Sequence, residues 1–432
     1  MFNDLKSLFI NKSIRKKILI TLAILAVYRF LVYVPVPFAD VDVLNIATWV
    51  WSSALSYFAL LLGGTLDNFS ILATWVAPYI NASIIIQLLN GVVPKLEQLQ
   101  DEGEVWQKKI AQITRWMTLP LAIIQWFWVS YFVNYYLWGN AIDLTWSNIA
   151  LVALVMAFGS MLLLYLGDLI TEKGIWNGIS MIIFTSIISG MSWSIFSSVW
   201  ATPNKIPVIL FIVGFIAILT ILSIYLIRTI KEIPVIYARQ WKVQQTSILP
   251  FPLNPVGMIP IIFAIAFVSF PYLLSQLLSR FGGSTAYIKN ASVWIEQNLN
   301  IYVNQPTLIT IFIYFVLIVF FTFFYSIVVF NPEKISDNIQ KKWGFIPSIR
   351  PGKETTKYIN TILSHLCLWG GMWLWLLGIF SYLLRYIPFL ENLFQWFGSI
   401  PTVVTGSGII IIVWVVQDLL NKIKSEKYMD TY

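Results

Sequence analysis

Residues 206–227 read IPVILFIVGFIAILTILSIYLI, an apolar run that contains no charged residue. A hydrocarbon core of about 30 Å takes roughly 20 apolar residues of helix, so a run of this length favours a membrane span. The whole chain is 58% apolar and only 11% charged, whereas soluble domains carry about 25% charged residues. The sequence therefore predicts a helical membrane protein that crosses the bilayer several times.

Similar runs recur along the chain, separated by short charged stretches, and we predict ten membrane-spanning helices. The approximate spans are 18–38, 74–93, 113–134, 148–167, 178–199, 206–227, 255–278, 307–330, 358–381 and 402–420. The first span runs straight on from Lys17 with no small-residue cleavage site behind it. We therefore expect it to be the first helix and not a cleaved signal peptide.

Basic residues accumulate in the cytoplasmic loops of membrane proteins, so their distribution predicts orientation. Most of the 28 Lys and Arg residues fall in the N-terminal arm, in the loops after the even-numbered spans and in the C-terminal tail. The opposite side has only Lys205, Arg280, Lys289 and Arg385. Both termini are thus expected in the cytoplasm.

Two basic loops, 228–253 and 331–357, are long enough to stand out from the membrane as a platform. Their charge is explained equally well by topology alone and by docking of a partner rich in acidic groups or RNA phosphate.

Residues 49–70, WVWSSALSYFALLLGGTLDNFS, are apolar but are interrupted by Gly63, Gly64, Asp67 and Asn68. Irregular backbone at membrane depth is tolerated only inside protein or beside a water-filled cavity. We predict a re-entrant half-helix on the extracytoplasmic side, and an amphipathic helix on the membrane surface is the alternative.

The chain has one cysteine, Cys367, and one histidine, His365, which argues against an internal disulfide and against a multi-histidine metal site. We expect both residues to be structural, and we expect no metal, no cofactor and no catalytic set. A membrane enzyme is disfavoured for the same reason. An ion-coupled transporter is disfavoured because the spans carry almost no charged residues apart from Arg29.

Several ordered segments resemble the SecY family of protein-conducting channels. These segments are GGTLDNFSILATWVAPYINASIIIQLL from 63, GEVWQKKIAQITR from 103, NGISMIIF from 177, KEIPVIYAR from 231, LPFPLNPVGMIPIIFA from 249, FNPEKISDNIQKKWGFIPSIRPG from 330 and GSGIIIIV from 406. The resemblance covers nearly the whole chain. It implies that the protein passes unfolded secretory polypeptides across the membrane and releases membrane helices through a lateral gate.

The fold implied by the resemblance is an all-α polytopic membrane protein, in which ten helices form two inverted five-helix halves around a re-entrant plug helix. The corresponding regions are an arm at 1–17, an N-terminal half at 18–199 that includes a plug at about 53–69, a C-terminal half at 200–421 and a tail at 422–432.

Particular positions match family sites. The aliphatic pore ring matches Val76, Ile80, Ile183, Ile262 and Ile411. The plug includes Gly63, Gly64, Asp67 and Asn68, and the polar positions of the lateral gate match Asn81, Gln125 and Asn254. A narrow apolar ring would block ions by dewetting.

The basic loops match the family's platform for ribosomes or the motor ATPase SecA. Docking is expected at Arg239, Lys242, Lys341, Lys342, Arg350 and Lys353. The other partners implied are SecE-like and SecG-like small membrane subunits, signal sequences, nascent polypeptides and the lipid bilayer, in the cell membrane of a prokaryote. One departure from the family is PSIRPG at 347–352, where PGIRPG is commoner.

Overall fold

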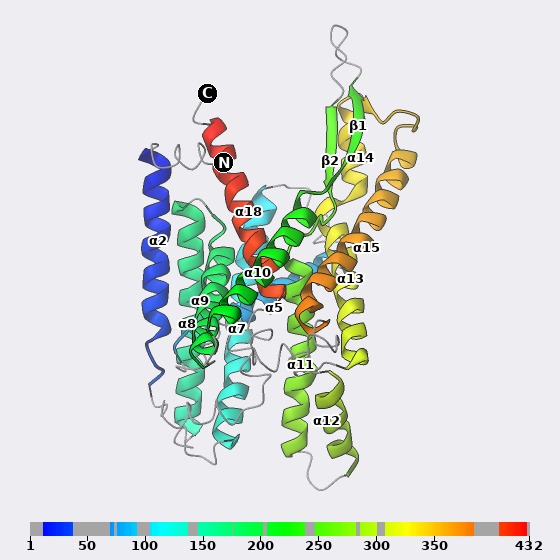
Figure 1. Cartoon of the computed structure of the whole chain (residues 1–432). Helices are drawn as coiled ribbons and strands as arrows, with labels where there is room; N and C mark the ends of the chain where they lie inside the picture. The colour runs from blue at the N-terminus through cyan, green and yellow to red at the C-terminus, as the bar shows by residue number, and fades with distance from the viewer. Residues whose placement is uncertain are drawn as a thin grey trace. The chain divides into compact units, whose positions relative to one another are not determined.

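The computed structural model describes residues 12–37, 70–72, 76–92, 104–136, 146–174, 176–201, 205–237, 247–281, 286–299, 307–383 and 406–429. Within these ranges the chain is mostly α-helical, with one small sheet (Figure 1). The predicted plug at about 53–69 lies outside the described residues.

Each of the ten predicted spans falls on an α-helix of the structure. These helices are α2 (Lys12–Val32), α5 (Ala77–Val92), α7 (Glu104–Tyr136), α8 (Trp146–Lys173), α9 (Gly178–Ala201), α10 (Lys205–Arg228), α11 (Ile259–Phe281), α13 (Leu308–Phe330), α15 (Lys353–Leu383) and α18 (Gly406–Met429). Two further helices, α12 (Ala286–Asn298) and α14 (Pro332–Lys341), lie in connections between predicted spans.

Five helical segments in the described part of the chain are long and apolar enough to cross a membrane. They lie at Ser147–Lys173, Lys205–Arg228, Leu308–Lys341, Lys353–Phe380 and Gly406–Ser425. Two shorter apolar helical segments, Gly178–Trp193 and Ile259–Val268, belong to α9 and α11. The structure therefore has several helices suited to lipid.

Helix α10 has apolar side chains on its exposed face as well as on its buried face. One face is buried and includes Ile212 and Leu219, whereas Leu210 and Ile221 on the other face are 68% and 66% exposed. A surface helix of a soluble protein would place polar residues on the exposed side. An apolar outer face fits contact with lipid tails.

The chain divides into two compact units, which are described separately. The first comprises residues 1–203 with 415–432, and the second comprises residues 204–414. The division within the chain falls near the predicted boundary between the two halves, at 199–200, which remains a prediction.

Close backbone contacts at glycines hold the first unit together. The α-carbon of Gly178, at the start of α9, lies against the carbonyl of Gly167 in α8, so that a methyl group there would overlap it. Gly159 in α8 lies equally close to the carbonyl of Ile71. Small residues permit such approach between membrane helices. In addition, the Tyr28 hydroxyl on α2 shares a buried hydrogen bond with Ser186 on α9.

The second unit contains α10 to α15 and the first turns of α18. Its helix α15 packs against α10, α11, α13 and α14. Gly370 of α15 lies against the Leu253 carbonyl, and Gly371 lies against Val319 of α13. Aromatic edges, such as that between Phe263 and Phe321 with ring centroids 5.6 Å apart, fill the contact between α11 and α13.

A three-stranded sheet departs from the all-α expectation. Strands β1 (Ile230–Tyr237), β2 (Ser247–Pro252) and β3 (Gly344–Phe345) pair antiparallel in the order β2-β1-β3. The sheet joins the two predicted basic loops, because β1 and β2 come from the first and β3 from the second. The two loops therefore form one folded region.

We call this region the platform; it consists of β1, β2, β3, α14 and the first turns of α15. Its core is a cluster of buried aliphatic and aromatic side chains from β1, β2, α14, α15 and the residue that follows β3: Ile233, Val235, Phe251, Ile339, Ile346, Ile359 and Leu363. Asn331 ends α13 and caps α14 by accepting a hydrogen bond from the Lys334 amide, and Pro332 follows at the first helical position. The FNPEK motif thus turns the chain from α13 into the platform.

Candidate functional site

Three of the five predicted pore-ring residues belong to the first unit. Val76 immediately precedes α5, and Ile80 lies one turn later, where its amide donates to the Val76 carbonyl at 2.9 Å. Both are buried, as is Ile183 in α9. The structure thus places buried aliphatic side chains at the start of α5 and on α9 of this unit.

The other two pore-ring residues belong to the second unit. Ile262 lies in the first turn of α11 and is partly buried, and Ile411 of α18 is buried. Three further isoleucines or valines near Ile411 on α18 are buried as well: Ile409, Ile410 and Val413. Each candidate is aliphatic and sheltered, and assembly of the five into one ring remains a prediction.

The predicted plug residues Gly63, Gly64, Asp67 and Asn68 lie outside the described part of the chain. The segment that follows them, Ser70–Leu72, is described and is held firmly.

Three contacts hold Ser70–Leu72 in place. Ser70 pairs with Pro35 in an isolated β-bridge, and the Ile71 amide donates to the Val34 carbonyl at 3.0 Å. The Ile71 carbonyl in turn fits against Gly159. We call this arrangement the clamp; sequence reasoning did not predict it.

The predicted gate residues differ in their burial and in their hydrogen bonds. Asn81 on α5 and Gln125 on α7 are half-buried on two helices that pack against each other. Asn254 is buried, and its side chain bonds within its own loop: Nδ2 donates to the Gly257 carbonyl at 2.8 Å, and Oδ1 accepts from the Gly257 amide at 3.1 Å. Asn254 therefore shapes the entry to α11, and its part in a gate remains a prediction.

The predicted docking residue Arg350 is exposed in the loop 346–352, which joins β3 to α15 and which we call the platform tip. Its carbonyl accepts a hydrogen bond from Thr355 Oγ1 at 2.9 Å, and the Gly352 carbonyl accepts one from Ser336 Oγ on α14 at 3.0 Å. These bonds fix the loop backbone while the guanidinium side of Arg350 faces solvent. Such a loop can present a charge at a defined position.

Ser348 in the same tip has a φ of 66°, in the left-handed region that favours glycine. This is the position at which PSIRPG departs from the commoner PGIRPG. The conformation explains why glycine suits this position.

The remaining docking candidates are divided between described and undescribed segments. Lys341 and Lys342 end α14, and Lys353 begins α15; all three are exposed. Arg239 and Lys242 lie in residues 238–246, outside the described ranges. The described candidates are thus exposed basic residues at the end of α14 and the start of α15.

An interhelical ion pair was missed in the sequence. Arg115 on α7 and Asp168 on α8 approach to 2.8 Å between Nη2 and Oδ1, with side chains 46% and 29% exposed. The fourth predicted span ends at 167, whereas α8 continues to Lys173 and includes Asp168. The sequence did contain a signal for this pair. Arg115 lies at the start of the third predicted span and Asp168 directly follows the fourth, so both fall on the same predicted side of the membrane.

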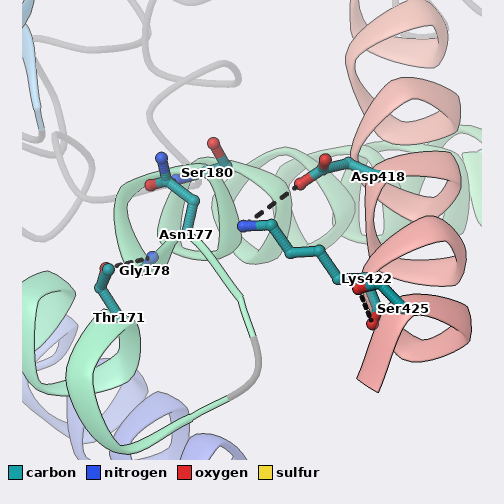
Figure 2. A network of polar contacts seen from close by, with 7 residues as sticks. All are labelled: Thr171, Asn177, Gly178, Ser180, Asp418, Lys422 and Ser425. Carbon is teal, nitrogen blue, oxygen red and sulfur yellow. Dashed lines mark hydrogen bonds and ion pairs between the residues drawn. The ribbon is translucent and has the colours of Figure 1, made fainter. Parts of the chain in front are cut away.

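Figure 2 shows the connection between α8 and α9 with the last turns of α18. Thr171 Oγ1 accepts from the Gly178 amide at 2.9 Å, and Asn177 Oδ1 caps α9 by accepting from the Ser180 amide at 3.4 Å. On α18, Lys422 and Asp418 form an exposed pair at 3.8 Å. The NGIS motif thus supplies a helix cap and a glycine contact.

The only cysteine and the only histidine of the sequence both lie on α15. Cys367 is buried, and His365 is exposed with Nδ1 2.7 Å from the Thr361 carbonyl. Across the described residues, no three His, Cys, Asp or Glu side chains gather as metal ligands would.

Comparisons with known proteins agree over the length of the chain. A model of the SecY family matches residues 70–420. Protein translocase subunit SecY of Staphylococcus carnosus is 32% identical over 450 aligned residues, which cover 100% of this chain and 99% of that protein.

Solved structures show the same fold. One described as the structure of a protein conducting channel matches with a TM-score of 0.63 at 17% identity, covering 96% of this chain and 92% of that one. Sec61 in the canine ribosome-channel complex from the endoplasmic reticulum matches with a TM-score of 0.58 at 16% identity, over the same shares. The family match over residues 70–420 and the full-length relative show that this chain belongs to the SecY family.

Proposed function

We propose that this chain is the channel subunit of a Sec translocase in a prokaryotic cell membrane, passing unfolded secretory polypeptides and releasing membrane helices sideways into lipid. The observation that carries the proposal is the SecY match over residues 70–420, which includes every predicted pore-ring position. The chain supplies no energy source of its own in this proposal.

In the proposed mechanism, ten helices cross the membrane as two inverted halves with both termini in the cytoplasm. Val76, Ile80, Ile183, Ile262 and Ile411 form the constriction. Aliphatic side chains exclude ions because a narrow apolar passage dewets. They also yield to a passing chain, since they offer it no specific bond.

Opening toward lipid is proposed to involve Asn81, Gln125 and Asn254. A few hydrogen bonds between membrane helices, each worth about 1 kcal/mol, would hold the closed state. A signal helix would shift this equilibrium by its greater affinity for the open state. The plug at about 53–69 would seal the extracytoplasmic side, with the clamp at Ser70–Leu72 as its fixed end.

The platform is proposed to receive a motor ATPase or a ribosome, and SecE-like and SecG-like subunits would complete the complex in the membrane. Sheet, helix and hydrophobic core make the platform a folded body, as a docking surface requires. Arg350 is proposed as the coupling residue, because its backbone is fixed and its side chain is exposed.

The test is translocation into liposomes that contain this chain and its small membrane subunits, with the motor ATPase and ATP. We expect protease protection of a signal-bearing substrate, and a loss of about tenfold or more with Arg350→Glu. The matched control is Lys424→Glu, which changes another exposed basic residue, on α18 outside the platform. A well-folded complex that protects no substrate with any motor or ribosome would refute the channel proposal.

A further inference from the structure

A pocket of about 430 Å³ lies between α2 and α8 in the first unit. The two helices pack against each other (Figure 1). Leu31 lines the pocket from α2, and a stripe of residues on successive turns lines it from α8. That stripe consists of Leu154, Val155, Phe158 and Leu162. These two sides of the pocket therefore carry only aliphatic and aromatic side chains.

The clamp contributes the remaining lining residues, Ile71 and Leu72. Leu72 is fully buried, and Ile71 is half-buried. The Ile71 amide bonds to the Val34 carbonyl, and the Ile71 carbonyl lies against Gly159, the neighbour of Phe158. Whatever fills the pocket therefore packs on the residues that hold the clamp in place.

Two of the lining residues belong to the outward-facing side of α8. Leu154 and Phe158 are 53% and 65% exposed, and Leu151 and Tyr165 continue this exposed stripe at helical spacing. Helix α8 contains Ser147–Lys173, one of the segments that are long and apolar enough to cross a membrane. The medium beside such a stripe in a bilayer is lipid. The pocket is thus continuous with a surface that lipid covers.

Other kinds of occupant fit the lining poorly. An apolar cavity stays dry, because a buried water needs polar partners. A polar small molecule would lack the few convergent polar groups that orient ligands in binding pockets. A neighbouring membrane helix would lie along α8 over many turns, whereas the lining extends over only about two turns, from Leu154 to Leu162.

The length of the pocket suits a lipid tail. Leu154 and Leu162 are separated by about 12 Å along the axis of α8, because a helix rises 1.5 Å per residue. One leaflet contributes about half of a hydrocarbon core of roughly 30 Å. A single unbranched chain from one leaflet can therefore reach along the whole lining.

We propose that this pocket holds one acyl chain of a membrane phospholipid and that the bound chain stabilises the clamp. The inference requires only that the protein lies in a bilayer, so it does not depend on the channel proposal. The site differs from the open faces of the helices, because two helices and the clamp surround the tail. Loss of the tail would leave a void beside Ile71 and Leu72, and such voids destabilise their surroundings.

The first experiment places the full complex in phosphatidylcholine nanodiscs that contain a trace of phosphatidylcholine with a diazirine at the end of one acyl chain. We expect photolabelling of Leu162. Val155→Trp should lower this labelling about fivefold or more, because the indole occupies the pocket. Leu151→Trp is the matched control, since Leu151 lies on the same exposed stripe but outside the lining. It should leave the labelling within about twofold.

The second experiment follows hydrogen exchange of the Ile71 amide in two bilayers that share one headgroup. Methyl branches widen an acyl chain, so exchange should be about fivefold faster or more in diphytanoyl phosphatidylcholine than in a straight-chain lipid. The Val155→Trp variant should lose this difference, because its side chain takes the place of the tail. The Ile80 amide, which bonds to Val76 away from the pocket, is the internal control.

Equal labelling of Leu162 in the unaltered chain and in Val155→Trp would overturn the inference. Equal exchange of the Ile71 amide in both bilayers would do the same, as would a crosslink from position 162 to a protein subunit in place of lipid. Leu162→Trp fills the pocket from its other end and replaces Val155→Trp in the exchange measurement if that variant fails to fold. Failure of the channel proposal is separate, since it would appear as absent signal-dependent protection and would leave these results unchanged.

Discussion

The helix contacts of the first unit and the core of the platform are built on different physical principles. In the first unit, Gly159 and Gly178 bring backbones into direct contact, and single polar pairs link helices. In the platform, large side chains such as Ile233 and Phe251 gather in a continuous apolar core. The same chain therefore uses small residues in one region and large ones in the other.

The difference follows from the solvent around each region. Lipid tails are as apolar as leucine, so helices in a bilayer gain little from burying aliphatic side chains and depend on close fit and hydrogen bonds. The platform is formed by the two basic loops that we predict to stand out from the membrane, and in water burial of apolar surface contributes about 25 cal/mol per Å². The two regions should consequently fail in response to different substitutions.

The largest effect is expected in the platform core. Phe251→Ala should destabilise the platform by about 3–5 kcal/mol, because Phe251 is buried among aliphatic side chains and its removal leaves a cavity. Hydrogen exchange of the β1 and β2 amides in the nanodisc complex measures the loss. Ile248→Ala, on the opposite and exposed face of the same strand, should change the exchange rates little. Equal loss of protection in both variants would contradict a sheet with one buried and one exposed face.

A smaller effect is expected at the helix contacts. Gly178→Ala should cost about 1–3 kcal/mol, since the added methyl group overlaps the Gly167 carbonyl and the two helices must separate. Thermal unfolding in nanodiscs, followed by tryptophan fluorescence, is the measurement. The control is Gly214→Ala on α10, where a methyl group meets nothing within 4 Å. An undiminished midpoint for Gly178→Ala would show that close approach is not required.

The Arg115–Asp168 pair should contribute less. Both side chains are partly exposed, so solvent screens their attraction, and the coupling energy should be about 0.2–1 kcal/mol. A double-mutant cycle with Arg115→Ala and Asp168→Ala measures it by unfolding at low and high salt. Coupling that is large and independent of salt would mean that the pair is effectively buried.

The smallest effect is expected at the platform tip. Ser348→Gly should stabilise the tip by about 0.5 kcal/mol, because relief of the left-handed backbone outweighs the added freedom of the unfolded chain. Gly352→Ala should act in the opposite direction, since Gly352 has a φ of 97°. Local hydrogen exchange of residues 346–356 distinguishes the two; a loss of protection in Ser348→Gly would refute the explanation.

The helices could be predicted from sequence because their signal is local and strong. Each predicted span coincides with a helix to within several residues at most ends. The larger differences are informative: α7 begins at Glu104 and α8 continues to Lys173, so both extend well beyond their apolar runs. Hydropathy predicts the apolar part of a helix. It does not predict how far the helix continues through polar residues beyond that part.

The platform sheet could not be predicted from the same signal. Its strands carry Pro234, Pro250 and Pro252, which disfavour a strand assignment. Pro234 is accommodated because β3 reaches only Ile236 and Tyr237, leaving one side of β1 without a strand partner at that position. The pairing of β1 with β3 joins residues more than a hundred positions apart, and no local pattern predicts it.

The sequence allowed us to predict which residues belong to the candidate site, but not which contacts those residues make. The resemblance supplied the ring, gate and docking positions, but the gate interpretation of Asn254 did not anticipate its bonds to Gly257. Asparagine commonly bonds to backbone two or three residues ahead, so a polar residue before a glycine has a local use as well as a distant one.

The clamp has a consequence for how the family sequence can vary. Pro35 and Ser70 are held together by a β-bridge, and Ile71 is fixed between Val34 and Gly159. The chain between these points leaves and returns at one place. Insertions or deletions between Pro35 and Ser70 need not alter the register of α2 or α5. The length and sequence of that segment can therefore vary without changing the helices on either side of it.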